Sequence, residues 1–414
     1  MGFEELRIHP DILKAIKRNG FVEPTPIQSR CIPEIKAGRD VVGQSLTGSG
    51  KTAAFGIPLL ESIHAGQGVQ SLILAPTREL ALQVCDNLVS LASFTSISIT
   101  AVYGGVGMQP QIDALKHADV VVATPGRMLD HLERNTANLR KVHIFILDEA
   151  DKMFEMGFID DVRDIISYLP EKRQTLLFSA TMPAAIHHLI REYLNEPSMI
   201  KEQIHVDTTL LKQVYYEIRP EEKFSFLVHL LKHKTPDLAI VFCATRRQVD
   251  VLARNLKLQH INAMAVHGGL SQHRRTHAVD SLKKENIQVL VATDIAARGL
   301  DIQNISHIYN YDSPKSSNDY THRIGRTARA GKYGEAVTLL SHKDYDNFRN
   351  VLSDSQIKVH KEELPQFEHV PFMREQHRAQ GRFPSRQPFG HSRSPSRFHH
   401  VRGGPRGRPP SRYS

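Results

Sequence analysis

Short apolar runs alternate with longer amphipathic segments along most of the chain, from its start to about residue 345. Near-continuous apolar runs between helices are typical of parallel sheets that are covered on both faces. In the first half this pattern predicts six strands, at Asp40–Gly43, Ser71–Ala75, Ser98–Tyr103, Val120–Ala123, Ile144–Leu147 and Thr175–Phe178. In the second half it predicts six more, at Val214–Ile218, Leu238–Cys243, Ala263–Val266, Val289–Val291, His307–Tyr311 and Ala336–Leu340.

Two groups of strands indicate an α/β protein with two tandem parallel-sheet domains and an open cleft between them. We expect the first domain over residues 1–205 and the second over residues 206–360, with a polar linker at Lys201–Lys212. Residues 361–414 form the expected tail. From Pro371 onward Arg, Gly, Pro, Ser and His dominate. Such a composition buries too little apolar surface to offset its conformational entropy, so we expect disorder there.

Several classes of protein are excluded by composition. No apolar run approaches the roughly 18 residues that indicate a membrane span. The start of the chain carries Glu4 and Glu5 and no apolar region, which excludes a signal peptide. The three cysteines lie too far apart for a disulfide framework or a zinc motif. We therefore expect no membrane partner and a cytoplasmic location, with a nuclear one left open.

A glycine-rich segment, Ser45-Leu-Thr-Gly-Ser-Gly-Lys-Thr52, follows a predicted strand and opens a helical pattern. Glycines let backbone N–H groups approach phosphates, and the helix N-terminus adds a favourable dipole. We expect Lys51 at the β- and γ-phosphates and Thr52 at Mg²⁺. The phosphate-binding loop would be completed by Thr47, Gly48, Ser49 and Gly50. A strict P-loop has Gly in place of Ser45, so a glycine-rich turn with a chance Lys-Thr remains an alternative at this point.

A second segment carries carboxylates. The apolar run Val142–Leu147 ends in Asp148-Glu149-Ala150-Asp151. Carboxylates at the C-terminal end of a parallel strand face the crevice where ligands bind. We expect Asp148 to hold Mg²⁺ and Glu149 to orient and deprotonate the attacking water. An acidic helix cap would not explain the preceding strand, so the two segments together indicate hydrolysis of ATP or GTP.

With this Asp-Glu-Ala-Asp tetrapeptide and further motifs in order, the chain resembles the DEAD-box ATP-dependent RNA helicases of superfamily 2 over about residues 3–345. The resemblance implies two RecA-like domains. Gly20-Phe21 followed by Pro24–Gln28 matches the family's Q motif, which selects ATP over GTP. Gln28 would meet the N6/N7 edge of adenine, and Phe3 and Phe21 are the aromatic candidates, with Phe3 stacking on the base.

The segment His322-Arg-Ile-Gly-Arg-Thr-Ala-Arg329 resembles the family's arginine-finger motif. By that resemblance Arg326 and Arg329 meet the γ-phosphate when the domains close. The family more often has Gly at Ala328. Asp301 would hydrogen-bond the ATP ribose.

Other family motifs imply coupling and RNA binding. Ser179 and Thr181 would link the nucleotide site to domain closure. Hydroxyls, backbone amides and Arg suit contacts to phosphate and sugar, which hold a strand without reading its sequence. The implied RNA-binding residues are Thr77, Arg78, Gly105, Thr124, Arg127, Thr245, Gln272, Arg275 and Thr293. The preference for RNA over DNA rests on the family alone.

The charge is unevenly distributed. The chain has 53 Lys and Arg against 44 Asp and Glu, a formal charge of +9. From Pro371 to Ser414 there are ten Arg, no Lys and one acid, Glu375, so the tail carries the whole excess. Arg-Gly pairs with interspersed Phe resemble RNA-binding tails, in which Arg neutralises phosphates and aromatics stack on bases. A merely solubilising tail is the alternative.

The function predicted is an ATP-dependent RNA helicase that unwinds short duplexes locally or remodels ribonucleoprotein particles. The alternative is an RNA clamp or annealing factor that uses ATP to gate its grip, since both share these motifs. A DNA helicase is disfavoured by the combined Q motif and Asp-Glu-Ala-Asp tetrapeptide. Partners in ribosome assembly are compatible with the family.

Overall fold

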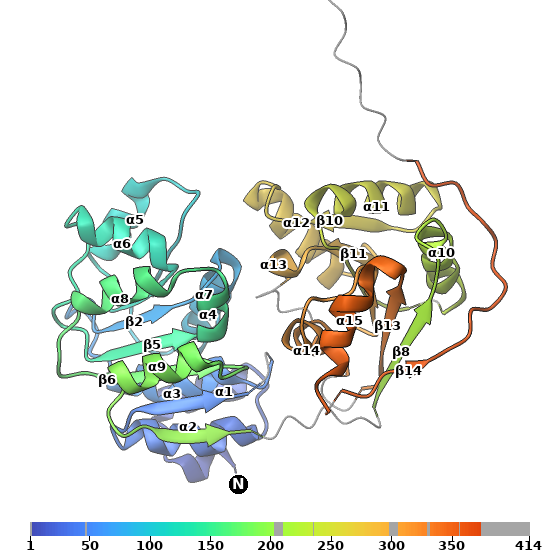
Figure 1. Cartoon of the computed structure of the whole chain (residues 1–414). Coiled ribbons are helices and arrows are strands. Elements are labelled where there is room, and N and C mark those ends of the chain that lie inside the picture. Colours follow the sequence, from blue (N-terminus) through green and yellow to red (C-terminus); the bar gives the residue numbers. More distant parts are fainter. Residues whose placement is uncertain are drawn as a thin grey trace, which may run out of the picture. The chain divides into compact units, whose positions relative to one another are not determined.

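The computed structural model describes residues 2–45, 48–202, 210–234, 236–297, 305–328, 332–355 and 357–373. These residues contain two seven-stranded sheets, in which every pair of neighbouring strands is parallel. Each sheet is covered by helices on both faces (Figure 1). The predicted α/β fold with two tandem RecA-like sheets is confirmed.

The first sheet has the strand order β3-β4-β2-β5-β6-β1-β7. Its strands are β1 (Val41–Gln44), β2 (Ser71–Leu74), β3 (Ile99–Val102), β4 (Val120–Ala123), β5 (Ile144–Asp148), β6 (Gln174–Ser179) and β7 (Ser198–Lys201). Central strands β2 and β4 are buried at every position, because helices cover both of their faces.

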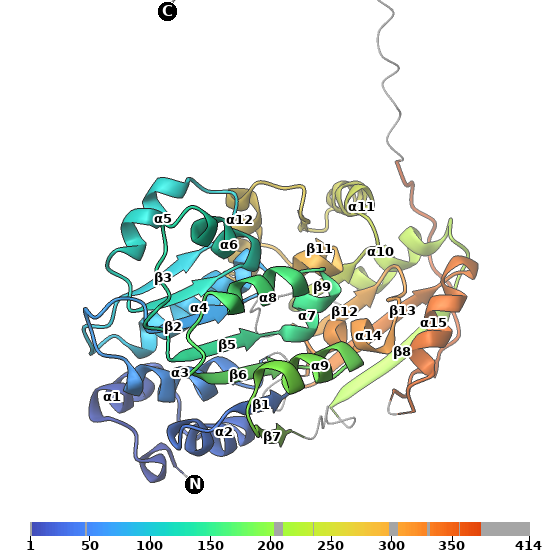
Figure 2. The ribbon, with the colours of Figure 1, turned by 60° about the vertical axis from the view of Figure 1, so that its left-hand side comes forward.

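Two hydrophobic cores lie on opposite faces of this sheet. One core includes side chains from α1 (Pro10–Arg18), α2 (Pro26–Lys36), α3 (Lys51–Ser62) and α4 (Arg78–Leu91). The other includes side chains from α5 (Met108–Leu115), α6 (Pro125–Glu133), α7 (Ala150–Glu155), α8 (Ile159–Ser167) and α9 (Ala184–Tyr193). Figure 2 shows α7, α8 and α9 along one side of this sheet.

The second sheet has the order β10-β11-β9-β12-β13-β8-β14. Its strands are β8 (Leu211–Glu217), β9 (Ala239–Phe242), β10 (Ala263–Val266), β11 (Val289–Ala292), β12 (His307–Asn310), β13 (Gly334–Leu340) and β14 (His360–Lys361). One face packs on α10 (Lys223–His233) and α11 (Arg246–Leu258). The opposite face packs on α12 (Gln272–Lys283), α13 (Asp294–Ala297), α14 (Ser317–Ile324) and α15 (Tyr345–Leu352).

All twelve predicted strands are present, but the expected count of six per sheet is wrong. The sequence interpretation missed β7 and β14, which are edge strands. β7 has a single buried residue, Ile200, and both residues of β14 are exposed, so neither produces an apolar run. The expected linker begins in β7 and ends in β8, and residues 203–209 lie outside the described residues.

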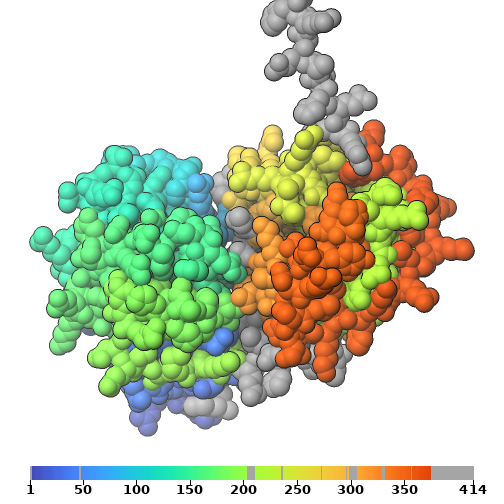
Figure 3. Space-filling view, viewed as in Figure 1, coloured from blue at the N-terminus to red at the C-terminus, as the bar shows by residue number. Residues whose placement is uncertain are grey.

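The start of the expected disordered tail also needs correction. Residues 361–373, which we call the C-terminal strap, pack on the second domain. The ring of Phe367 lies 5.2 Å from that of Phe226, and Phe372 lies 4.9 Å from Phe224. In the space-filling view, red atoms of the last described residues lie against the green region of β8 and α10 (Figure 3). Isolated aromatic residues in a polar segment give no regular spacing of apolar positions. The sequence therefore did not reveal that this segment packs on the second domain.

Hydrogen bonds fix the end of the strap. Met373 N donates to Asn255 Oδ1 at 2.8 Å, and Asn255 Nδ2 donates to the Met373 carbonyl at 3.0 Å. The Arg-rich segment that follows, residues 374–414, lies outside the described residues. In the part of the chain that the structure describes, no helix combines the length and apolar character needed to cross a bilayer.

Candidate nucleotide and RNA site

Three neighbouring strands bring the sequence motifs of the first domain to one edge of its sheet. β5, β6 and β1 lie side by side in the order of the sheet. Because they are parallel, their carboxyl ends meet at the same edge, which is where open α/β sheets bind ligands. The Asp-Glu-Ala-Asp segment begins with the last residue of β5, the Ser-Ala-Thr segment begins with the last residue of β6, and the glycine-rich loop follows β1.

The glycine-rich loop is held by hydrogen bonds to its neighbours. Ser45 N donates to the Ser179 carbonyl at 3.1 Å, and the hydroxyls of Ser45 and Ser49 lie 2.7 Å apart. The contact of the Ser45 hydroxyl with Ser49 is one that the Gly of a strict P-loop cannot make. Lys51 opens α3, is 6% exposed and donates from Nζ to the Ser45 carbonyl at 2.9 Å. Thr47 lies outside the described residues.

Gln28 connects the Q motif to this loop. Its Oε1 accepts a hydrogen bond from Thr25 N at 3.0 Å, and its Nε2 donates to the Gly50 carbonyl at 3.1 Å. A Cβ on Gly50, whose φ is +93°, would lie 2.3 Å from Gln28 Nε2. A primary amide has two N–H groups and two acceptor sites, so Gln28 keeps one of each for an adenine edge. The exposed Gly48 and half-buried Ser49 complete the described part of the loop.

The two aromatic candidates for the base differ in exposure. Phe3 is 2% exposed, belongs to the hydrophobic core with residues of α1 and α2, and lines a pocket together with Phe21. The stacking of Phe3 on the base stays a prediction. Phe21 is 42% exposed and lies in the loop that follows α1, so a base can reach its ring.

Asp148 has the properties of a cation ligand. It is the last residue of β5 and is 2% exposed. Burial raises its pKa to about 7; the nearby charge of Lys51 opposes this shift, and Glu149 adds to it. Among the described residues, no group hydrogen-bonds to Asp148 Oδ1. Burying a carboxylate oxygen without a partner is costly, so the site fits a bound Mg²⁺ ion. Thr52, the second residue of α3, is half-buried and supplies the hydroxyl expected there.

Glu149 has an unusual backbone conformation. Its φ of +52° and ψ of +51° lie in the left-handed region, and its side chain is 5% exposed. A non-glycine residue there stores roughly 1–3 kcal/mol of strain, and such residues cluster at functional sites. The turn sets Glu149 at the start of α7, directly after Asp148, whose Oδ1 has no hydrogen-bond partner in the described part of the chain.

The residues expected to couple the nucleotide site to closure form one network with Asp151. Asp151 Oδ2 accepts hydrogen bonds from Thr181 N at 3.0 Å and Thr181 Oγ1 at 2.8 Å. Ser179 Oγ donates to the Thr181 carbonyl at 2.7 Å and accepts from Asp151 N at 3.3 Å. A shift of the Asp-Glu-Ala-Asp turn would therefore move the Ser-Ala-Thr segment with it.

Arg78 and Gly105 are in close contact in the first domain. A Cβ on Gly105, whose φ is +85°, would lie 2.1 Å from Arg78 Nη1. Thr77 Oγ1 caps α4 by accepting from Leu80 N at 3.2 Å. A side chain at position 105 would therefore displace the guanidinium and strain the backbone of the loop that follows β3.

Arg127 also braces this loop. Its Nη1 donates to the Val106 carbonyl at 3.1 Å and to Gln111 Oε1 at 3.3 Å. Thr124 precedes α6 and makes no capping hydrogen bond with its side chain. The expected RNA-binding residues of the first domain therefore lie on the loops and the first helical turns that follow β2, β3 and β4.

We predict that Gly105→Ala weakens binding of single-stranded RNA by about tenfold, the equivalent of roughly 1.4 kcal/mol. The added methyl group would collide with the Arg78 guanidinium and strain the backbone. Fluorescence anisotropy with a labelled oligonucleotide measures the effect. Gly104→Ala is the matched control, because its Cβ would lie 3.5 Å from Arg78 Nη2, an ordinary contact. Equal affinity of the two variants would contradict this role of Gly105.

The second domain contributes its expected residues at the starts of helices. Thr245 caps α11, since its Oγ1 accepts from Gln248 N at 3.2 Å. Thr293, half-buried, follows β11 directly. Arg275 is half-buried on α12, and Gln272 begins that helix, although its side chain lies outside the described residues.

Arg323 is a residue that sequence reasoning did not assign. It is 3% exposed, and its Nε and Nη2 donate to the two carboxylate oxygens of Asp294 at 2.6 and 2.8 Å. Its Nη1 donates to Asn310 Oδ1 at 3.0 Å, and its guanidinium lies 5.0 Å from the centre of the Phe242 ring. The only signal in the sequence was its place within the arginine-finger motif. Arg323 fixes α14 relative to α13.

Arg326 follows this anchored helix. It is 3% exposed and lines a small pocket with Asp294, Asp319 and Arg323. Ala328, where the family more often has Gly, has a φ of +54°, the conformation that favours Gly. Arg329 and Asp301 lie outside the described residues.

Comparison with known proteins identifies the family. Residues 25–189 match the DEAD/DEAH box helicase model, and residues 222–331 match the helicase conserved C-terminal domain. The chain is 44% identical over 366 residues to the DEAD-box ATP-dependent RNA helicase CshA of Geobacillus kaustophilus, covering 88% of this chain and 78% of that protein. It is 43% identical over 366 residues to CshA of Bacillus subtilis, covering 88% and 74%.

Solved structures of similar proteins point to the same family. Dbp5 of S. cerevisiae bound to RNA and ADP BeF3 superimposes with a TM-score of 0.79 at 33% identity, over 87% of this chain and 95% of that one. A DEAD box protein of Methanococcus jannaschii is 42% identical, with a TM-score of 0.55, over 87% and 99%. The motifs lie together at one edge of the first sheet, and the relatives and solved structures point to the same family. The chain belongs to the DEAD-box ATP-dependent RNA helicases.

Proposed function

We propose that this chain is an RNA-dependent ATPase that separates short RNA duplexes locally or remodels ribonucleoprotein particles. The observation that carries the proposal is the physical connection at the edge of the first sheet. There the Q motif bonds to the glycine-rich loop, and the loop bonds to the Ser-Ala-Thr segment. That segment bonds in turn to Asp151. The Q motif, the glycine-rich loop, the Ser-Ala-Thr segment and the Asp-Glu-Ala-Asp turn are thus joined through one hydrogen-bonded chain.

In this proposal ATP binds with its base at Phe21 and Gln28 and its phosphates at the loop ending in Lys51. Thr52 and Asp148 would hold Mg²⁺, which would supply positive charge beside the phosphates. Lys51 leaves the Ser45 carbonyl to meet the phosphates. Glu149 orients a water molecule and accepts its proton.

RNA binding completes the site in the same proposal. The hydroxyl, backbone and Arg groups of both domains hold one strand by its phosphates and sugars. Closure brings Arg326 and Arg329 to the γ-phosphate, while Asp301 binds the ribose. The Asp151–Thr181 hydrogen bonds pass the state of the nucleotide to the RNA-binding loops.

A strand-displacement assay run beside an annealing assay tests the proposal. A short RNA duplex with a labelled strand should release that strand when ATP is present, and ADP should not support release. A protein that instead accelerates pairing of the separated strands, and releases none, would be an ATP-gated annealing factor or clamp.

We predict that the Arg-rich tail adds RNA affinity. A chain ending at Met373 keeps the strap and removes all ten tail Arg. It should bind single-stranded RNA more weakly, and its affinity should depend less steeply on salt. Each phosphate that the protein neutralises adds about 0.7 to the slope of log affinity against log salt concentration. Its ATP turnover at saturating RNA should be unchanged. A full-length chain with these Arg replaced by Gln should behave like the truncated one, whereas replacement by Lys should preserve binding. Unchanged affinity at low and high salt would contradict the prediction and leave the tail as a solubilising segment.

Further expectations stay predictions: the limit between the two domains at residue 205, the cytoplasmic location, and partners in ribonucleoprotein or ribosome assembly.

A further inference from the structure

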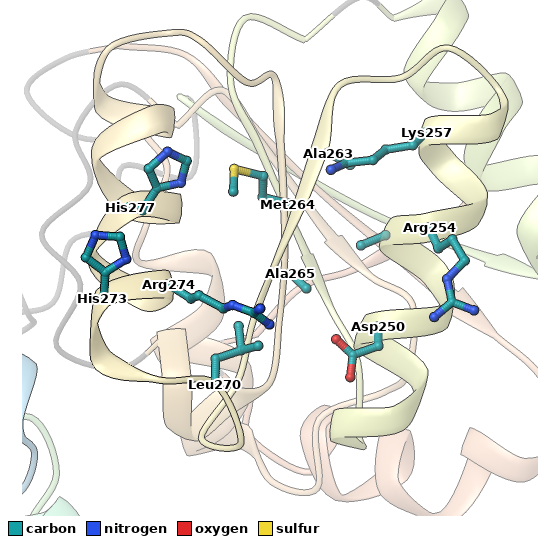
Figure 4. A pocket seen from close by; sticks show the side chains of 11 residues that line it. Asp250, Arg254, Lys257, Ala263, Met264, Ala265, Leu270, His273, Arg274 and His277 are labelled. Carbon is teal, nitrogen blue, oxygen red and sulfur yellow. The ribbon is translucent and has the colours of Figure 1, made fainter. Parts of the chain in front are cut away.

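A groove of about 610 Å³ lies between α11 and α12 of the second domain, above β10 (Figure 4). In Figure 4 the side chains of α12 line one wall and those of α11 line the other. None of the residues assigned above to ATP or RNA lines this groove. Arg275, although it lies on α12, is not among the lining residues.

The groove follows from the sheet topology. β10 is the first strand in the order of the second sheet and pairs with β11 only, among the described residues. α11 packs on one face of the sheet, and α12 packs on the other. The two helices therefore flank an uncovered sheet edge, whose Met264 and Ala265 are partly exposed. Uncovered edges are places where proteins recruit other chains.

The floor of the groove is aliphatic. It consists of Ala253 from α11, Met264 and Ala265 from β10, and Leu270 from the loop before α12. No Phe, Tyr or Trp is among the residues that line the groove. Bases also stack on His rings and Arg guanidinium planes, but the His and Arg side chains of this groove lie on its walls, on α11 and α12, and not on its floor (Figure 4). A floor of Ala, Met and Leu is better suited to a bulky apolar side chain, and Met adapts readily to different shapes.

The rim of the groove is basic. Arg254 and Lys257 lie on α11, and Arg274 lies on α12 together with His273 and His277. The single acid, Asp250, has its Oδ1 2.9 Å from His267 Nε2. Three permanent positive charges thus surround an apolar floor, although residues 1–370 have equal numbers of acidic and basic residues. Charge complementarity therefore favours an acidic occupant.

We propose that this groove is a docking site for an acidic segment of a partner protein, which inserts a bulky apolar side chain between α11 and α12. Carboxylates of the segment pair with Arg254, Lys257 and Arg274. The site would attach this helicase to another protein without occupying the ATP or RNA site.

The test uses the full-length chain and a library of short random peptides displayed on phage. Peptides are selected on the unmodified protein and then measured against Arg254→Glu/Arg274→Glu. We expect selected peptides to be rich in Asp and Glu around a Phe, Leu or Met. They should bind at least tenfold more weakly to the double variant, and their binding should weaken as salt rises. Leu270→Ser should weaken binding without changing its salt dependence.

Lys283→Glu/Lys284→Glu is the matched control, since it reverses two charges at the end of α12 outside the groove. It should bind the peptides as the unmodified protein does. RNA-stimulated ATP hydrolysis of all variants should remain unchanged, which shows that they fold. Selected peptides that lack acidic residues, or that bind equally to both double variants, would overturn the proposal. A tenfold loss of RNA affinity in Arg254→Glu/Arg274→Glu would overturn it too, because the groove would then belong to the RNA path.

Discussion

Glu149→Gln should lower RNA-stimulated ATP hydrolysis by about 10²–10⁴-fold, the range that a general base contributes. The amide keeps the shape of the side chain but cannot accept the proton of the attacking water. The strained backbone at Glu149 is set by the turn after β5, so the substitution should leave the position of the side chain intact. Steady-state turnover at saturating RNA measures the effect, and binding of a labelled ATP analogue should be unchanged.

Glu171→Gln, in the exposed turn before β6, is the control for loss of a carboxylate and should keep full activity. If Glu149→Gln retains RNA-stimulated turnover, another group must activate the water. The role assigned to Glu149 would then be wrong.

Arg326→Ala should lower the turnover number by about 10³–10⁵-fold, as expected for an arginine finger in phosphoryl transfer. Its charge is needed when negative charge develops at the γ-phosphate, so affinity for ATP and RNA should change far less than turnover. Arg326→Lys should recover only part of the rate, because an ammonium group lacks the planar fork of the guanidinium.

Arg326 is 3% exposed, so its variants should be compared by thermal denaturation before their kinetics are interpreted. Arg349→Ala, an exposed change on α15, is the control for loss of an Arg from the same domain. A variant that folds, binds ATP and RNA, and loses less than tenfold in turnover would refute the finger assignment.

Buried apolar strands and contiguous motifs were predictable from the sequence, because each leaves a local pattern. Buried central strands such as β2 and β4 are apolar at nearly every position. The phosphate-binding loop and the Asp-Glu-Ala-Asp turn depend on residues that are adjacent in the chain. Both motifs lie where a strand ends, as expected.

Features that depend on distant residues were not predictable in the same way. The strap at residues 361–373 docks through isolated Phe side chains, and Arg323 meets Asp294 across 29 positions in the sequence. Phe3 matched the family spacing, but its burial is determined by packing on neighbouring helices. The basic groove combines residues of two helices and an edge strand, and no single segment of the sequence shows it.

RNA should switch on ATP hydrolysis at this site. ATP turnover measured with single-stranded RNA, with DNA of the same sequence, and with neither tests this directly. We expect strong stimulation by RNA, little by DNA and low turnover without nucleic acid. Equal stimulation by DNA and RNA, or full turnover with neither, would contradict it.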